Sequence, residues 1–248
     1  MKKVNGPLTH VIDIKSAGIT AIIGSGGKST LLRALGLELM RAGSNVLLAT
    51  TTHMYPVAGV PWAGTGERMR TNPWARPIHA PGCTCEACMG PRGRICQAGT
   101  LDAQTGKMGA PQENLTELAT RYDHVLVEAD GSHRLPLKAH AAWEPVIPEG
   151  ARHVIWVVGA SGFGRPVREA VHRPQIFCEL AGIGPDDLAT PEAVAHVLST
   201  ERTALELDSA TVLVNQVDGP EQEKEAERLE TALGLEVLAW GRSMPGHP

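Results

Sequence analysis

The stretch TAIIGSGGKSTLLRAL, residues 20–35, connects an apolar run to a leucine-rich segment through three closely spaced glycines. The apolar run, residues 19–23, predicts a short strand that is covered on both faces. In the leucine-rich part, apolar residues recur at helical spacing up to Met40, and Gly43 follows where a helix would end. The sequence therefore predicts a strand, a glycine turn and a helix in direct succession.

Strands and helices continue to alternate along the rest of the chain. Such alternation is typical of a parallel sheet with helices on both faces, so we expect a doubly wound α/β fold in a single domain over residues 1–248. Ligands of such sheets lie beyond the carboxyl ends of the strands. The further strands are predicted at 45–49, 124–130, 153–160, 210–218 and 235–240, and the further helices at 112–119, 191–199 and 220–233.

The glycine turn has the composition of a phosphate-binding loop. Its glycines allow backbone N–H groups at a helix N-terminus to approach an anion without Cβ clashes. Lys28 supplies a charge for the β- and γ-phosphates, and the hydroxyl of Ser29 can bind Mg²⁺. Ile22 stands where the common loop has its first glycine, so the loop is shorter here; we expect a sheet of the P-loop NTPase type rather than glycines that merely pack. The predicted phosphate-binding residues are Gly24, Ser25, Gly26, Gly27, Lys28, Ser29 and Thr30.

Two acids end the apolar strand HVLVEAD, residues 124–130. Glu128 and Asp130 point the same way if the chain stays extended. A nucleotide site needs an acid at the end of a neighbouring strand to hold the metal shell. We expect one acid to orient Mg²⁺ together with Ser29 and the other to position a water, with Lys28 as the third catalytic group; which acid has which role stays open. The alternative is that Asp130 and Gly131 only form a turn.

The segment VNQVDGPE, residues 214–221, resembles the N-K-x-D motif with which GTPases recognise the base. Asn215 and Asp218 are the candidates for purine recognition, whereas Gln216 replaces the lysine. An equally weighted alternative is that Asp218, with Glu221 three residues later, caps a helix. The choice between ATP and GTP stays open.

Further polar side chains are candidates for a substrate or switch role. Some follow the second strand at the same carboxyl edge, and others are basic residues on later loops. These candidates are Thr51, Thr52, His53, Lys138, Arg165 and Arg173.

An irregular insertion rich in proline and glycine is predicted over residues 55–110. Its segment RICQAGTLDAQTGKMGA, residues 94–110, is compatible with a small hairpin. Four cysteines follow the pattern C-x-C-x2-C-x7-C, which favours a Zn²⁺ site, then an iron–sulfur cluster, over free thiols. The candidate metal ligands are Cys83, Cys85, Cys88 and Cys96.

Composition excludes several classes of partner. The 27 acidic and 23 basic residues give a net charge of −4, so no overall field attracts nucleic acid. No apolar run reaches the roughly 18 residues that a membrane span needs. Asp13 and Lys15 interrupt the first apolar residues before a signal-peptide core forms, so a cytoplasmic protein is expected.

Taken in order, GSGGKSTLL, TTTHMYP, VLVEADGSHRLPLKAH, EPVIP, VHRP and VLVNQVD resemble the YqeC family of selenium-dependent molybdenum hydroxylase accessory proteins. The resemblance covers about residues 19–238. It implies a P-loop nucleotide-binding protein that assists the maturation of a selenium-dependent molybdenum hydroxylase. The cysteine pattern is not a general family feature, and Ser29 stands where the family usually has threonine.

The leading hypothesis is therefore Mg²⁺-dependent nucleoside triphosphate binding and hydrolysis, coupled to that maturation. One alternative is a nucleotide-gated chaperone for metal, selenium or the molybdenum cofactor, without significant turnover. A third is an ATP-dependent ligase or small-molecule kinase, because the short loop and the threonine–histidine segment resemble the ATP domain of Mur and folylpolyglutamate ligases.

Overall fold

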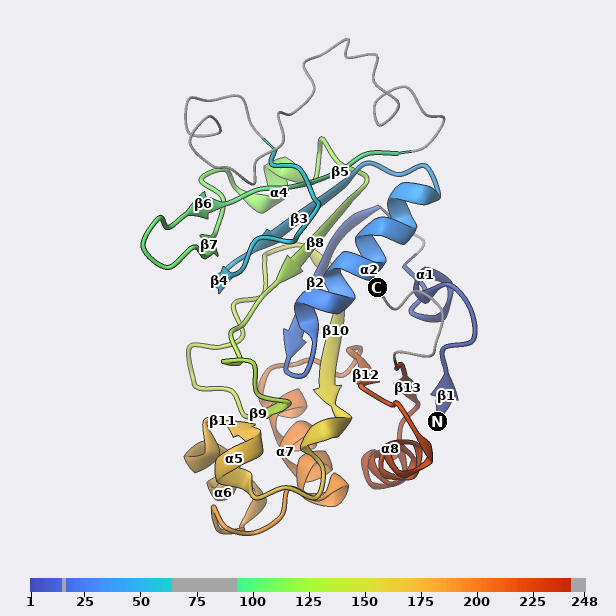
Figure 1. Cartoon of the computed structure of the whole chain (residues 1–248), viewed down its shortest axis with the longest axis vertical. Coiled ribbons are helices and arrows are strands. Elements are labelled where there is room, and N and C mark those ends of the chain that lie inside the picture. Colours follow the sequence, from blue (N-terminus) through green and yellow to red (C-terminus); the bar gives the residue numbers. More distant parts are fainter. Residues whose placement is uncertain (15–16, 64–92, 242–248) are drawn as a thin grey trace.

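The computed structural model describes residues 1–14, 17–63 and 93–241. Its centre is an eight-stranded sheet in which all neighbouring strands are parallel (Figure 1). The doubly wound α/β fold is thus confirmed. In spatial order the strands are β1 (Lys2–Lys3), β13 (Val237–Ala239), β12 (Thr211–Asn215), β10 (Ala151–Gly159), β2 (Gly18–Gly24), β8 (His124–Glu128), β3 (Val46–Thr50) and β5 (Ile95–Gln97).

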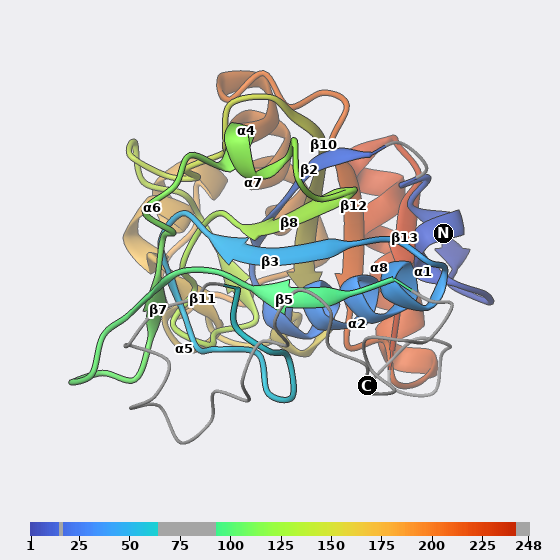
Figure 2. The same ribbon diagram turned by 90° about the horizontal axis from the view of Figure 1, so that it is seen from above.

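Helices cover both faces of the sheet (Figure 2). On one face, α1 (Leu8–Val11) and α2 (Lys28–Arg41) enclose a fully apolar core with the inward side chains of the strands. On the other face, two core clusters form under the remaining helices. These are α4 (Leu115–Leu118), α5 (Val167–Ala170), α6 (Pro174–Ala181), α7 (Pro191–Ala204) and α8 (Pro220–Leu233).

Two small sheets lie at the carboxyl edge of the large one. β9 (Leu137–Lys138) pairs in parallel with β11 (Val171–His172). The antiparallel strands β4 (His53–Met54), β7 (Met108–Gly109) and β6 (Thr100–Leu101) form the other. A short 3₁₀ turn, Ala160–Gly162, follows β10. None of the described helices combines the length and the apolar character of a membrane span.

The predicted irregular insertion is more ordered than expected where the structure describes it. β5 lies within it and extends the large sheet beside β3, with Val46 opposite Ile95. The hairpin proposed for residues 94–110 is confirmed in part, since β6 and β7 pair. The candidate ligands Cys83, Cys85 and Cys88 lie outside the described residues.

Other elements differ from the prediction mainly at their ends. The helix expected over 112–119 is shorter, because Asn114 caps it by accepting a hydrogen bond from the backbone N–H of Thr116. The strand expected over 124–130 ends at Glu128, so Asp130 lies beyond it. Helices α5 and α6 were not predicted; both are short, and α6 begins with Pro174 at its first turn.

The order of the strands determines which loops meet. β2 lies between β8 and β10, although the chain runs from β2 through α2 to β3. The residues that follow β2, β8, β10 and β12 therefore converge on the same carboxyl edge, which is where a doubly wound sheet binds its ligands.

Candidate functional site

The glycine loop between β2 and α2 has a backbone that only glycine adopts easily. Gly24, Gly26 and Gly27 have φ angles of 90°, 86° and 120°. A Cβ on Gly26 would lie 2.3 Å from the Cα of Gly159, and one on Gly27 would lie 2.1 Å from the Nδ2 of Asn215. The loop is thus packed tightly against the ends of β10 and β12.

The N-terminus of α2 opens onto a cleft of about 600 Å³. The first hydrogen bond of the helix runs from Leu31 N–H to the carbonyl of Gly27, at 3.0 Å. The preceding N–H groups have no acceptor within the helix, and the N-cap Gly27 offers no side chain. The part of the loop that lines the cleft consists of Gly26, Gly27, Lys28, Ser29 and Thr30.

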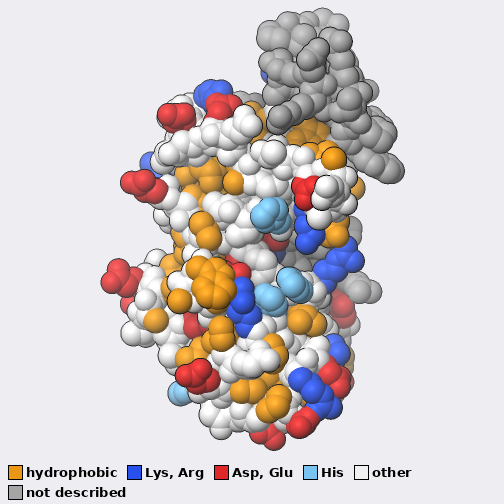
Figure 3. Space-filling model, turned by 90° about the vertical axis from the view of Figure 1, so that its left-hand side faces the viewer, with side chains coloured by type: hydrophobic (Ala, Val, Ile, Leu, Met, Phe, Trp, Pro, Cys, Tyr) orange, Lys and Arg blue, Asp and Glu red, His pale blue; other side chains and the backbone are white. Residues whose placement is uncertain are grey.

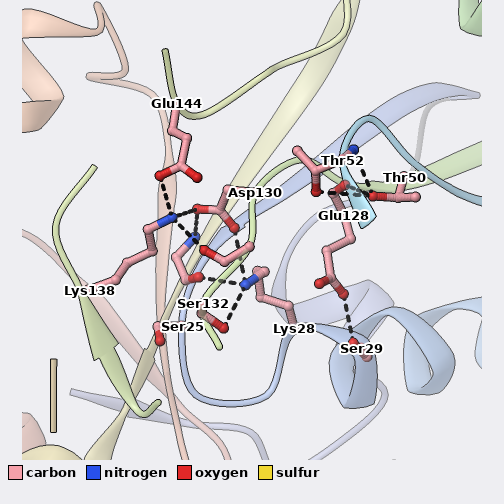
Figure 4. Close-up of polar contacts among 12 residues, drawn as sticks. Ser25, Lys28, Ser29, Thr50, Thr52, Glu128, Asp130, Ser132, Lys138 and Glu144 are labelled. Carbon is pink, nitrogen blue, oxygen red and sulfur yellow. Dashed lines mark hydrogen bonds and ion pairs between the residues drawn. The ribbon is translucent and has the colours of Figure 1, made fainter. Parts of the chain in front are cut away.

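Asp130 is the buried centre of the charges behind this loop (Figure 4). Its Oδ1 lies 3.1 Å from Lys28 Nζ, and its Oδ2 lies 3.1 Å from Lys138 Nζ. The backbone N–H of Gly24 donates to the same Oδ2 at 2.8 Å. Lys28 also donates to the carbonyl of Gly24 at 2.7 Å and to Ser132 Oγ at 3.2 Å. The carboxylate therefore holds the loop and both ammonium groups in place.

A buried histidine links Asp130 to helix α7. His140 lies with Nε2 2.8 Å from Asp130 Oδ2 and Nδ1 2.8 Å from Glu201 Oε2, and its backbone N–H donates to Glu201 Oε1 at 2.6 Å. Burial lowers the pKa of His140, but the two carboxylates outweigh it and raise that pKa overall. Burial raises the pKa of Asp130, whereas Lys28, His140 and Lys138 hold it well below the usual range. Both pKa shifts favour the ionised forms of the pair.

Glu128 occupies the cleft itself. Its Oε2 accepts a hydrogen bond of 2.7 Å from Ser29 Oγ, and its side chain lines the cleft beside the loop. Burial raises the pKa of Glu128, and the nearby charge of Lys28 opposes that rise. The two acids of HVLVEAD therefore differ in position: Glu128 faces the cleft, whereas Asp130 has no exposed surface.

The donor set fits Mg²⁺ at Ser29 and Glu128. Mg²⁺ sites commonly use one or two carboxylates or hydroxyls of the protein, with phosphate oxygens and waters completing the shell. Within the described ranges, no three His, Cys, Asp or Glu side chains gather into a metal site made of protein ligands alone. Asp130 contacts lysines and a histidine, so Glu128 is the one of these two acids that could contribute a ligand to a metal in the cleft.

Three of the predicted substrate or switch residues follow β3. His53 lines the cleft, whereas Thr51 and Thr52 do not. Thr51 Oγ1 donates to the carbonyl of Val146 at 2.7 Å, and the N–H of Thr52 donates to Thr50 Oγ1 at 3.0 Å, so both threonines order the turn after β3. Thr50 Oγ1 in turn donates to the carbonyl of Glu128 at 2.8 Å.

The three predicted basic residues do not line the cleft. Lys138 is buried between Asp130 and Glu144, whose Oε2 lies 3.2 Å from its Nζ. Arg173 donates to the same Glu144 oxygen at 3.0 Å. Arg165 is exposed and lies 3.9 Å from a surface carboxylate, that of Glu169.

The segment VNQVDGPE contacts the glycine loop through the side chain of Asn215. The Nδ2 of Asn215 donates to the carbonyl of Gly26 at 2.8 Å, and its Oδ1 accepts from the N–H of Gln216. Gln216 lines the cleft. The N-cap of helix α8 is Gly219, without a side-chain hydrogen bond, so Asp218 precedes the N-cap position. Base recognition by Asn215 and Asp218 stays a prediction.

Cys96 lies in β5, half-buried, with Sγ 3.4 Å from the hydroxyl of Tyr122. Burial raises the pKa of its thiol, and the hydrogen bond with Tyr122 opposes that rise. Since the other three cysteines of the pattern lie outside the described residues, a Zn²⁺ or iron–sulfur site stays a prediction.

Sequence reasoning missed several residues of the site. Their common feature is distance along the chain from the glycine loop, so no local spacing indicates them. The segment GSHRLPLKAH, residues 131–140, was the strongest available signal, as it combines basic residues with the end of a buried strand. The missed cleft residues are Tyr55, Lys107, Ser132, His133 and Arg134, and the missed buried partners are His140, Glu144 and Glu201.

Replacing Asp130 tests the buried charge network. In Asp130→Asn the side chain keeps its size, but Lys28 loses the carboxylate that pairs with it, and Lys138 keeps only Glu144. We expect the free energy of unfolding, measured by urea denaturation, to fall by about 3–5 kcal/mol. Glu113→Gln, which removes an exposed ion pair with Arg121, is the matched control and should change it little. Equal effects of the two substitutions would contradict the role of Asp130.

The protonation of His140 predicts a specific pH dependence. Because its pKa is raised in the folded protein, its contribution to stability is complete below the unfolded value of about 6.5 and is lost as pH rises through the folded value. The contribution of Asp130 changes only below about pH 4, so measurements above pH 5 isolate the histidine. The unfolding free energy of the wild type relative to His140→Gln should therefore shrink as pH rises above 6.5. A difference that grows with pH would show that His140 is neutral.

Comparison with known proteins identifies the family. The model of the family described as "YqeC protein" matches residues 20–175. The chain is 33% identical over 195 residues to the protein of Escherichia coli (strain K12) described as "Uncharacterized protein YqeC", an alignment that covers 75% of this chain and 70% of that protein. No solved structure gives a significant match. The match covers the glycine loop, both acids and the buried network up to Arg173, and the chain therefore belongs to the YqeC family.

Proposed function

We propose that this protein binds a nucleoside triphosphate with Mg²⁺ in the cleft and hydrolyses it, in support of the maturation of a selenium-dependent molybdenum hydroxylase. One observation carries the nucleotide part: a loop with three glycines at positive φ leads into the N-terminus of α2 at the edge of a 600 Å³ cleft. Free N–H groups and the helix dipole make that position attractive to phosphate.

Lys28 is the cation for the phosphates. It is almost fully buried, yet it belongs to the lining of the cleft, and neutral oxygens of Gly24 and Ser132 are two of its three partners. A phosphate oxygen would replace these neutral acceptors with a charge-assisted hydrogen bond, which is about twice as strong. Asp130 would remain as the counter-ion behind the lysine.

Ser29 and Glu128 are the residues that would hold Mg²⁺. Bound there, the ion would neutralise charge on the phosphate oxygens. Glu128 and Ser29 already contact each other, so their oxygens converge on one place in the cleft. Lys28 and the N–H groups of the loop would stabilise the charge that develops in the transition state.

A second candidate function follows from the burial of Asp130. Hydrolysis was expected to use the second acid of the strand to position water, but both oxygens of Asp130 face lysines and a histidine. A site without that carboxylate favours slow turnover. A nucleotide-gated chaperone for metal, selenium or the molybdenum cofactor is therefore the alternative to an efficient NTPase.

The assignment to molybdenum hydroxylase maturation rests on the family resemblance alone. ATP and GTP are both candidates for the nucleotide. Measurements with both nucleotides are therefore part of each test.

Loss of the Lys28 charge should abolish most nucleotide binding. We expect Lys28→Met to weaken binding of Mg²⁺-ATP or Mg²⁺-GTP, whichever the wild type prefers, by about 10–100-fold in isothermal titration calorimetry. Lys224→Met on the exposed face of α8 is the control, and circular dichroism verifies that both variants fold. Unchanged affinity in a folded Lys28→Met protein would refute the proposal.

Removal of the Glu128 charge should weaken the binding of Mg²⁺. In Glu128→Gln we expect the Mg²⁺ concentration for half-maximal turnover to rise by about 10–100-fold, because a ligand position loses its charge. Glu113→Gln should behave like the wild type. An unchanged Mg²⁺ requirement would mean that Glu128 does not hold the ion. Turnover near zero in the wild type, with tight nucleotide binding, would select the chaperone alternative.

A further inference from the structure

One end of the cleft carries a cluster of cations around a tyrosine. Arg134 lies with Cζ 5.0 Å from the centroid of the Tyr55 ring, and Lys107 lies with Nζ 5.7 Å from the same centroid. His53 and His133 line the cleft beside them. Figure 3 shows Lys, Arg and His side chains gathered across the middle of this face. We call Lys107, Arg134, His53 and His133 the basic rim.

The basic rim has little negative charge to balance it. In the part of the chain that the structure describes, no carboxylate lies within ion-pair distance of Lys107 or Arg134. Asp102, in the same hairpin as Lys107, accepts hydrogen bonds from Gln104 N–H and Thr105 Oγ1 of its own turn. Glu128, the acid of the cleft, is bonded to Ser29. Two like charges held around one ring repel each other, and a bound anion would relieve that repulsion.

The backbone at His133 and Arg134 adopts an unfavourable left-handed conformation, which directs the Arg134 side chain. His133 and Arg134 are consecutive non-glycine residues with φ angles of 49° and 63°. Left-handed conformations of such residues cost roughly 1 kcal/mol or more each and persist mainly where function requires them. The His133 ring also stacks on His172, with ring centroids 4.6 Å apart. The orientation of the rim is therefore built into the loop.

The strand order places the two halves of the basic rim differently. His53 follows β3, with Tyr55 and Lys107 beside it, whereas His133 and Arg134 follow Ser132, whose Oγ lies 3.2 Å from Lys28 Nζ. Across the carboxyl edge, β12 with Gln216 comes first, then the glycine loop after β2, then Glu128 at the end of β8, and finally His53 after β3. Glu128, which would hold Mg²⁺ together with Ser29, lies between the glycine loop and the side of the cleft that carries His53, Tyr55 and Lys107. These three residues therefore lie on the opposite side of Glu128 from Gln216, and Arg134 reaches the Tyr55 ring from the segment after β8.

We propose that the basic rim binds a second, anionic small molecule, bearing a phosphate or a carboxylate, at the same time as the nucleotide. This inference rests on the proposed function for the identity of the first ligand. Lys107 and Arg134 recognise the anionic group, and Tyr55 holds the two cations together. The cleft is then a two-ligand site in which the second ligand lies beside Glu128.

Calorimetry on the full chain tests this proposal. Inorganic phosphate and, separately, succinate are titrated into protein saturated with Mg²⁺ and a non-hydrolysable analogue of the preferred nucleotide. One equivalent of at least one probe should bind, and the stronger probe identifies the anionic group. Arg134→Gln and Lys107→Gln should each weaken probe binding by tenfold or more and change nucleotide affinity by less than twofold. Arg165→Gln, an exposed arginine outside the cleft, should bind both ligands as the wild type does.

Three results would overturn the proposal: no probe binding to the nucleotide-loaded protein, probe binding that the rim variants leave unchanged, or a tenfold loss of nucleotide affinity in those variants. A tenfold loss of nucleotide affinity would show that the basic rim binds the nucleotide itself. If the wild type binds no nucleotide, the proposed function fails, and the probes are titrated alone. Probe binding lost in Arg134→Gln but kept in Lys28→Met would then retain the rim as an anion site, whereas equal loss in both variants would remove it.

Discussion

The carboxylate of Asp130 is the constraint on which this site depends. An ionised carboxylate without exposed surface is tolerated only when it is paired and hydrogen-bonded, because burial alone costs several kcal/mol per ion. Asp130 meets that condition with two ammonium groups, the His140 ring and one backbone N–H. These partners come from two segments that are far apart in the sequence, the glycine loop with Gly24 and Lys28 and residues 138–140 with Lys138 and His140. The charges therefore join the glycine loop, β9 and α7 into one unit.

The same arrangement gives the two acids of one strand different roles. Glu128 is the last residue of β8 and faces the cleft, where its carboxylate accepts a hydrogen bond from Ser29. Asp130 follows the end of the strand and faces inward. A carboxylate with such a low pKa stays ionised and holds Lys28 at the loop. One acid thus maintains the charge of the site while the other remains free to bind a ligand.

The sequence predicted the fold well and the site in part. Periodicity located β2, α2, β3 and the later strands, and the order of Gly27, Lys28 and Ser29 located the cleft, because these signals are local. The separate roles of Glu128 and Asp130 were not predictable, since alternation assumes a strand that continues through Asp130, and β8 ends two residues earlier. The network around Asp130 continues through His140 to Glu201, and only the packing of α7 brings that glutamate there.

The insertion is part of the site because backbone pairing attaches it to the sheet. β5 adds to the edge of β3, and β7 pairs with β4, placing Met108 opposite Met54. Lys107 precedes Met108, and Tyr55 follows Met54, so the strand register itself sets this lysine beside the tyrosine ring. Main-chain hydrogen bonds hold such a register more firmly than side-chain contacts on a loop would. Residues of the insertion thus form one wall of the cleft, although the sequence of the insertion lacks regular periodicity. They include Lys107, whose charge a second ligand would meet.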